Sequence, residues 1–187
     1  MSQERRNRLA EQIVDTQPRL TTFVRRLPSD LIAGSWDLLS YSFQQGFELM
    51  WDQACAESSD LLTRPLLSLW RQSVELALKA SILEIAGSIP DKLSHNLRGL
   101  FERLLAERAA LGHDDDDDLA RDVARMIDLV QTFDPFADRF RYPTKKDGTP
   151  FAGIQVDLDE LFQAHWIIVT WCEGAAIEVR EGWGPHS

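Results

Sequence analysis

The chain has 187 residues, a formal net charge of −10 and 44% hydrophobic residues, which suits one sizeable domain or a domain with a helical extension. This composition argues against a disordered chain, and no apolar run is long enough to span a bilayer. The charged N-terminus lacks an apolar signal core, so we expect a cytoplasmic protein with no membrane contact. The two cysteines, Cys55 and Cys172, are then expected as reduced core thiols. The acidic field opposes nonspecific nucleic-acid binding, so any RNA contact needs a confined basic patch.

The first sixty residues predict helices that pack on the rest of the molecule or extend it. Residues 1–27 carry a loose apolar stripe at helical spacing, which Pro18 interrupts. The Pro28-Ser29-Asp30 sequence restarts the chain, and Ser29 or Asp30 is expected to cap a second helix over residues 31–57. We therefore divide the chain into residues 1–60 and a helical core over residues 61–187.

The core region predicts an all-α, antiparallel helix bundle with one irregular segment. Gly87 and Gly112 suit helix ends, and Asp134-Pro135 breaks a third helix. Residues 136–156 have turn chemistry around Asp147-Gly148, which predicts a short hairpin or an ordered loop before the last helix. The expected helices of this region cover residues 65–86, 94–111, 117–132 and 157–179.

Three charged residues fall on one stripe of the helix at 65–86. Arg71, Glu75 and Lys79 are spaced four residues apart, beside the apolar face and not opposite it. This placement lets Arg71 and Glu75 border a groove between helices. Ordinary salt bridges along an exposed helix explain the same spacing, and the sequence leaves both interpretations open.

A histidine opens the helix that follows. With Ser94 as the N-cap, His95 takes the first helical position, where the helix dipole disfavours the imidazolium and a neutral ring is expected. His95 is then a candidate proton carrier near neutral pH. The alternative is a solvent-exposed or capping histidine that packs against the preceding loop.

These residues resemble the helical pair of HEPN-domain proteins. The resemblance rests on Arg71-x3-Glu75-x3-Lys79, on Ser94-His95-Asn96-Leu97, and on Phe133-Asp134 followed by Phe140-Arg141-Tyr142-Pro143. It covers roughly residues 65–180. HEPN domains are compact bundles of antiparallel helices from prokaryotic toxin–antitoxin, phage-defence and CRISPR-linked systems. The resemblance therefore implies a homo-oligomer of a bacterial defence or toxin–antitoxin type system, which binds RNA, a nucleotide or a protein partner.

The resemblance also implies a possible enzyme, because many HEPN proteins are metal-independent ribonucleases with an Arg-x4–6-His motif late in the bundle. Here the literal match is Arg108…His113, which Gly112 interrupts and an acidic run over residues 114–118 follows. Five carboxylates make a poor phosphate site, so we favour binding over catalysis. His165 in the last helix has no such arginine before it and lies on the apolar stripe, so we expect a buried, hydrogen-bonded histidine.

The residues predicted to carry function are therefore ranked. His95, Arg71 and Glu75 are the candidate catalytic set, and Arg108 with His113 is its alternative. The candidate ligand contacts are Lys79, Arg98, Arg141 and Tyr142.

A basic cluster around residue 140 has two interpretations. Arg139, Arg141, Lys145 and Lys146 interleave with aromatic residues, a mixture that can hold a phosphate or stack a base. The same side chains can simply fix the loop to the bundle.

The remaining features predict contacts of other kinds. The acidic run at residues 114–118 is expected to be a solvated loop and lacks the spacing of a calcium loop. Trp166 and Trp171 suggest central burial or a subunit contact, which leaves a non-catalytic adaptor as a further alternative. The sequence has no Walker loop, dinucleotide glycine motif or zinc spacing, so no cofactor or metal is expected.

Overall fold

The computed structural model describes residues 3–16, 30–57, 60–89 and 95–182, and these residues form the predicted all-α architecture. None of the helices in these ranges is long and apolar enough to cross a membrane. The elements in chain order are α1 (Gln3–Thr16), α2 (Trp36–Ala56), a 3-10 turn (Asp60–Leu62), α3 (Thr63–Ala86), α4 (Leu97–Ala110), α5 (Asp118–Phe133) and α6 (Leu158–Arg180).

The chain divides into two units, Met1–Ala33 and Gly34–Ser187. The first unit contains α1, and the second contains all the other helices. Helix α2, which belongs to the N-terminal region of residues 1–60, packs on α3 within the second unit. The rest of the helix predicted over residues 1–27 lies outside the described residues.

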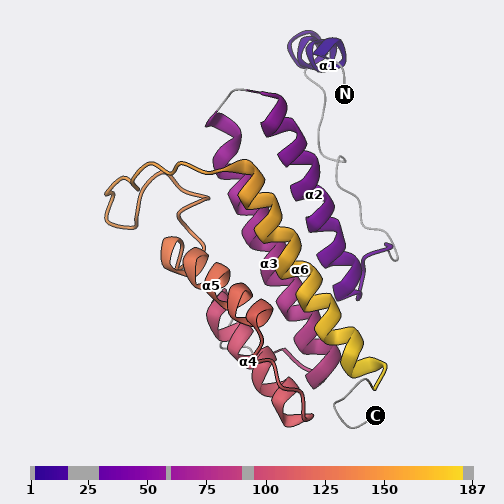
Figure 1. The fold of residues 1–187 in the computed structure, drawn as a ribbon. Coiled ribbons are helices and arrows are strands. Elements are labelled where there is room, and N and C mark those ends of the chain that lie inside the picture. The colour runs from indigo at the N-terminus through magenta and orange to yellow at the C-terminus, as the bar shows by residue number, and fades with distance from the viewer. Residues whose placement is uncertain (1–2, 17–29, 58–59, 90–94, 183–187) are drawn as a thin grey trace. The chain divides into compact units, whose positions relative to one another are not determined.

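Helix α3 is the centre of the bundle. It runs beside α6, with α2 on one side and α4 and α5 on the other (Figure 1). Trp70, Val74 and Leu78 lie on its buried stripe and are at most 1% exposed. The Trp70 indole donates to the carbonyl of Leu161 at 3.1 Å, and the Ser81 hydroxyl donates to the carbonyl of Cys172 at 2.8 Å. Because buried donors need partners, these bonds fix α6 against α3.

Most helix ends match their predicted positions, but two starts do not. Gly87 ends α3 with a φ of 69°, a left-handed conformation that favours glycine. Helix α2 begins at Trp36, capped by Ser35, because the Asp30 carboxylate instead accepts the amides of Ile32 and Ala33 in a separate turn. Asp30 is therefore not the cap of α2, and that alternative of the prediction was wrong. Ser29, the other predicted cap, lies outside the described residues.

The start of α4 is also shifted. Asn96 is its N-cap, and the side-chain oxygen of Asn96 accepts the Gly99 amide at 3.1 Å. The prediction that His95 takes the first helical position is therefore wrong, because His95 lies before the helix. Ser94, the expected cap, is outside the described residues.

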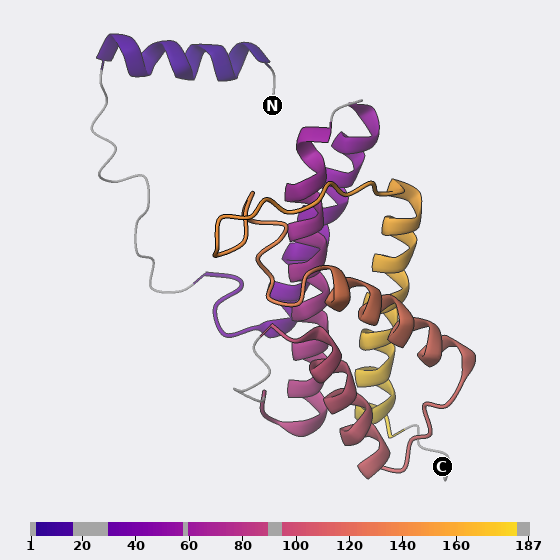
Figure 2. The same ribbon diagram turned by 90° about the vertical axis from the view of Figure 1, so that its left-hand side faces the viewer.

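The segment between α5 and α6 is an ordered loop that projects from the bundle (Figure 2). Its tip is closed by an antiparallel bridge between Thr144 and Pro150 and by the Lys145 amide, which donates to the Thr149 carbonyl at 2.8 Å. This confirms the predicted ordered loop. Arg64 of α3 holds the base of the loop by donating to the carbonyls of Arg139 at 3.1 Å and Tyr142 at 2.9 Å.

The two cysteines differ in their surroundings. Cys172 is fully buried, and burial raises the pKa of its thiol. Cys55 is exposed, so its prediction as a core thiol was wrong. Its neighbour Ala54 is buried on the core-facing side of α2, and the next position along the helix turns about 100° away from that side.

Candidate anion-binding site

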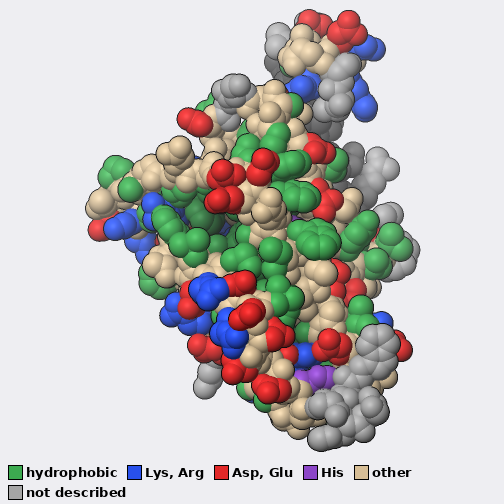
Figure 3. Space-filling model, in the orientation of Figure 1, with side chains coloured by type: hydrophobic (Ala, Val, Ile, Leu, Met, Phe, Trp, Pro, Cys, Tyr) green, Lys and Arg blue, Asp and Glu red, His purple; other side chains and the backbone are tan. Residues whose placement is uncertain are grey.

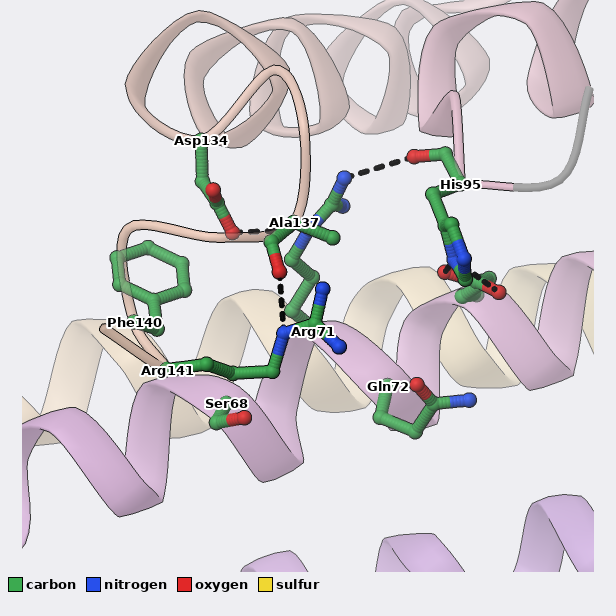
Figure 4. Close-up of a pocket in the computed structure, with 9 residues that line it drawn as sticks. Ser68, Arg71, Gln72, His95, Asp134, Ala137, Phe140 and Arg141 are labelled. Carbon is green, nitrogen blue, oxygen red and sulfur yellow. Dashed lines mark hydrogen bonds and ion pairs between the residues drawn. The ribbon is translucent and has the colours of Figure 1, made fainter. Parts of the chain in front are cut away.

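A small recess of about 30 Å³ lies between α3, the residues before α4 and the loop after α5 (Figure 4). This is room for about one water molecule or one oxygen atom of a larger ligand. Four of the predicted residues, Arg71, Glu75, His95 and Arg141, line it together. Asp134 and Ala137 complete the part of its wall that the loop supplies. We call this cavity the Arg71 recess.

Arg71 is deeply buried, with 3% of its surface exposed. Of the charged side chains at the recess, only Asp134 and Glu75 are less exposed. Its Nη2 donates to the His95 carbonyl at 2.7 Å. Its Nε and Oδ2 of Asp134 form an ion pair at 3.1 Å, and neither atom has a further hydrogen-bond partner among the described residues. Its Nη1 is buried and has no hydrogen-bond partner among the described residues. Arg71 is therefore a buried cation that the protein satisfies only in part.

Burial also sets the electrostatics of Arg71. Loss of solvent lowers the pKa of its guanidinium, and Asp134 and Glu75 counteract this only partly. The guanidinium of Arg141 lies on the same side of the recess and lowers the pKa of Arg71 further (Figure 4). An anion bound between the two guanidinium groups relieves this repulsion.

Glu75 and His95 form a carboxylate–imidazole pair. Glu75 is 2% exposed, and its Oε2 lies 3.0 Å from Nδ1 of His95. A carboxylate accepts, so Nδ1 carries the hydrogen and Nε2 is left to accept or exchange a proton. Lys79 donates to Oε1 of Glu75 at 2.8 Å, which balances the buried carboxylate. The His95 side chain itself is 51% exposed at the edge of the recess.

The loop after α5 supplies the other wall. Oδ1 of Asp134 accepts the amides of Asp138 at 2.8 Å and Arg139 at 3.0 Å, which closes the turn. Ala137 has a φ of 56°, a left-handed conformation uncommon for a residue other than glycine. This turn directs the Ala137 carbonyl at Nε of Arg141, which donates to it. A local backbone strain of about 1 kcal/mol is thus maintained beside the recess.

No family model, no curated protein and no solved structure matches the chain. The resemblance to HEPN domains therefore stays a prediction. Any role for the chain rests on the geometry of its own side chains.

Three of the predicted ligand contacts do not line the recess. Lys79 reaches it only through Glu75. Arg98 pairs with Asp128 across α4 and α5. The Tyr142 ring lies 5.8 Å from the Arg141 guanidinium, so it stacks behind that group.

The alternative catalytic pair has a different structure. Arg108 is 4% exposed, and each of its nitrogens has a partner. Its Nε donates to Asp115 at 2.8 Å, Nη1 to the Ala175 carbonyl at 2.6 Å and Nη2 to Glu178 at 2.8 Å. Nδ1 of His113 lies 3.9 Å from the same Glu178. With all its nitrogens in use, Arg108 joins α4, α6 and the acidic run and is poorly placed to bind a phosphate.

The acidic run has contacts of its own. Asp117 caps α5 by accepting the Ala120 amide at 2.7 Å, and Arg121 pairs with Asp116 and Asp118. Within the described ranges, no group of three or more potential ligand side chains is arranged to hold a metal ion. The carboxylates of this run therefore order the start of α5.

His165 and the two tryptophans complete the predicted features. His165 is buried, and its Nε2 lies 2.9 Å from the Ser73 hydroxyl, which confirms the predicted core histidine. Burial lowers its pKa to about 4. Trp166 is 59% exposed, whereas Trp171 packs against Phe101 with ring centroids 5.2 Å apart. Of the pair, Trp166 is the one open to a subunit contact.

Asp134 is the one central residue that the sequence does not assign to the site. The Asp134-Pro135 pair indicates only a helix break. An aspartate directly after a helix and before proline is a usual turn former, so its second contact, with Arg71, gives no separate sequence signal.

Proposed function

We propose that this protein binds the phosphate group of a nucleotide or of RNA at the Arg71 recess. The observation that supports the proposal is the buried Arg71 guanidinium, whose Nη1 has no hydrogen-bond partner among the described residues. A guanidinium prefers a planar, charged acceptor or a phosphate, whose oxygens accept its N–H groups in pairs.

The size and charge of the recess suit part of a phosphate. A volume of about 30 Å³ takes one oxygen, so the rest of the group lies at the mouth, beside Arg141 and His95. The guanidinium groups of Arg71 and Arg141 balance the carboxylates of Glu75 and Asp134 at the recess. Lys79, bonded to Glu75 outside the lining, leaves one positive charge beside it, which favours an anion.

The same proposal accommodates the family resemblance. A HEPN-like protein of a bacterial defence or toxin–antitoxin system meets nucleotides and RNA, and a phosphate site at the helical pair is compatible with that setting. Homo-oligomer formation belongs to this proposal as well.

Isothermal titration with inorganic phosphate, AMP and a short oligoribonucleotide tests the proposal. Arg141→Gln and His95→Ala change side chains at the mouth, and each is expected to weaken binding about tenfold or more, as for a charged hydrogen bond. Arg98→Gln is the matched control, since Arg98 is an exposed arginine that pairs with Asp128 away from the recess. The phosphate site is refuted if all three variants bind with the affinity of the wild type, or if the wild type binds none of the three ligands.

A second candidate function is metal-independent ribonuclease activity at the same recess. The Glu75–His95 pair favours it, because a carboxylate on Nδ1 orients Nε2 to take a proton. His95 then removes the proton of a ribose 2′-OH, whose oxygen attacks phosphorus to form a 2′,3′-cyclic phosphate as the bond to the 5′-oxygen breaks. The proton on His95 passes to the departing 5′-oxygen, directly or through water. Arg71 and Arg141 stabilise the charge that develops on the phosphorane.

Cleavage of a labelled oligoribonucleotide separates the two candidate catalytic sets. His95→Ala abolishes cleavage if the recess is the active site, whereas His113→Ala leaves it unchanged. Loss of activity in His113→Ala alone assigns catalysis to the Arg108–His113 pair. A wild type that binds RNA and does not cleave it has the binding function only.

A further inference from the structure

A second cavity lies on the other side of the loop that closes the Arg71 recess. Its volume is about 560 Å³, within the range of small-molecule pockets. Basic side chains lie among hydrophobic ones on this projecting loop (Figure 3). We call this second cavity the loop hollow. Its basic and aromatic lining residues are Phe133, Phe136, Arg139, Lys145, Lys146 and Phe151.

Arg139 organises the wall of the hollow. Its guanidinium carbon lies 5.3 Å from the Phe133 ring centroid and 5.9 Å from that of Phe151. Its Nη1 and Nη2 donate to the carbonyls of Phe133 and Ala152, each at 3.3 Å. Its Nε is buried without a hydrogen-bond partner among the described residues. The wall is therefore a stack of two aromatic rings and one cation.

Phe136 and the two lysines are the open part of the hollow. Phe136 is 77% exposed, a large apolar surface for a loop, and both lysines are exposed. Asp138 and Asp147 also line the hollow, so its three cations leave a net charge of +1 on a protein of net charge −10. Exposed aromatic faces beside cations are the arrangement that binds single-stranded nucleic acid.

The loop hollow and the Arg71 recess share one wall. Ala137, Phe140 and Arg141 line the recess, whereas their neighbours Phe136 and Arg139 line the hollow. The same short stretch of the loop therefore contributes side chains to both cavities. A strand with a phosphate in the recess can place an adjacent nucleotide in the hollow.

We infer that the loop hollow binds a base of single-stranded nucleic acid, stacked on Phe136, with Lys145 and Lys146 on the neighbouring phosphates. The inference rests on the proposed phosphate site and narrows its ligand from a lone nucleotide to a strand. It also gives a reason for an exposed phenylalanine on an ordered loop.

Fluorescence anisotropy with labelled oligouridine and oligodeoxyuridine of about eight nucleotides tests the stacking. Phe136→Leu keeps an apolar side chain but removes the ring, and it is expected to weaken binding to both strands about tenfold. Phe136→Tyr keeps the ring and is expected to stay within about twofold of the wild type. Tyr41→Leu removes another exposed aromatic ring, on α2 and outside both cavities, and this matched control is expected to have no effect.

The lysines are tested by salt dependence. Lys145→Ala/Lys146→Ala is expected to reduce the slope of log affinity against log salt by about 1.4, since each single-strand phosphate contact contributes about 0.7. Arg125→Ala removes one exposed cation on α5 and is expected to leave the slope unchanged. Tighter wild-type binding of one strand type identifies that strand as the ligand.

Failure of the inference is distinguishable from failure of the phosphate site. If Phe136→Leu and the double lysine variant bind oligonucleotides like the wild type while Arg141→Gln does not, the recess stands and the loop hollow is overturned as a base site. Binding of inorganic phosphate without any binding of oligonucleotides overturns the loop hollow in the same way. If the wild type binds neither phosphate nor oligonucleotides, both the phosphate site and the base site are refuted.

Discussion

Arg71 and Arg108 are two buried arginines in one helical bundle, and their surroundings are opposite. Each is less than 5% exposed. Arg108 uses all three of its nitrogens on Asp115, Glu178 and the Ala175 carbonyl. Arg71 makes one hydrogen bond, to the His95 carbonyl, and leaves Nη1 without a partner among the described residues. Burial of a cation thus serves structure at one site and leaves capacity for a ligand at the other.

The pKa directions of the two arginines follow the same contrast. Burial alone lowers the pKa of each guanidinium. At Arg108, the hydrogen bonds that it donates to Asp115 and Glu178 outweigh burial, and the pKa is raised. At Arg71 burial dominates, and the pKa is lowered. The protein therefore stabilises the charge of Arg108 and tolerates that of Arg71.

Substitution of Arg108 is expected to cause the largest loss of stability. Arg108→Met leaves the Asp115 carboxylate and the Ala175 carbonyl without their donor, so the free energy of unfolding falls by about 3 to 5 kcal/mol. Urea unfolding followed by circular dichroism measures it. The control is Arg125→Met, which breaks an exposed pair with Asp122 and costs about 0.5 kcal/mol or less. Similar losses in the two variants contradict a structural role for Arg108.

His165 is also a buried basic side chain, and its side-chain partner is the hydroxyl of Ser73 and not a carboxylate. Burial lowers its pKa to about 4, below the usual value of 6.5 for the unfolded chain. As pH falls from about 6.5 to about 4, the unfolded chain takes up a proton that the folded chain refuses, so about 3 kcal/mol of stability is lost. Above pH 6.5 the group contributes no pH dependence.

Urea titrations at several pH values measure this effect. His165→Phe is expected to lower stability at neutral pH, because Ser73 loses its partner. It is also expected to reduce the slope over that window, so the difference from the wild type shrinks as the pH falls toward 4. An unchanged slope in the variant means that His165 is protonated in the folded state.

Removal of the Arg71–Asp134 ion pair is expected to cost much less than loss of Arg108. Arg71→Met/Asp134→Asn replaces an ion pair without a hydrogen bond, and the amide oxygen of the substituted side chain still accepts the amides of Asp138 and Arg139. The free energy of unfolding is then expected to change by about 1 kcal/mol or less. Arg71→Met alone leaves Asp134 buried and unpaired, so a single variant as stable as the double one contradicts this account.

The fold was predictable because its signals are local. Together with the helical spacing of apolar residues, Gly87, Gly112 and Asp134-Pro135 placed the ends of three helices within a residue or two. The start of α2 was missed because Asp30 and Ser35 are equally good caps, and only packing of the helix on α3 selects the second. Cys55 was misplaced because each step of one residue along a helix turns the side chain by about 100°, so a shift of one position exchanges the buried face for the exposed one.

The site was predictable in part for a similar reason. Arg71, Glu75 and His95 share the helical pair, and their meeting follows from spacing and a short connection. Asp134 joins them from more than fifty residues away, and no local pattern records an ion pair at that separation. The unpartnered Nη1 of Arg71 is a property of three-dimensional packing, which spacing along one helix does not contain.

Phosphate is expected to have the smallest effect on stability, and the most specific one. At about three times its dissociation constant a ligand raises the free energy of unfolding by about 0.8 kcal/mol. Phosphate also stabilises proteins in general by exclusion from their surfaces, so the wild type is compared with Arg71→Met/Asp134→Asn and with Arg98→Gln. The extra stabilisation is expected in the wild type and Arg98→Gln and not in the double variant, because only that variant lacks the Arg71 guanidinium. Equal phosphate stabilisation in all three proteins means that Arg71, although incompletely paired, is as closed to ligands as Arg108.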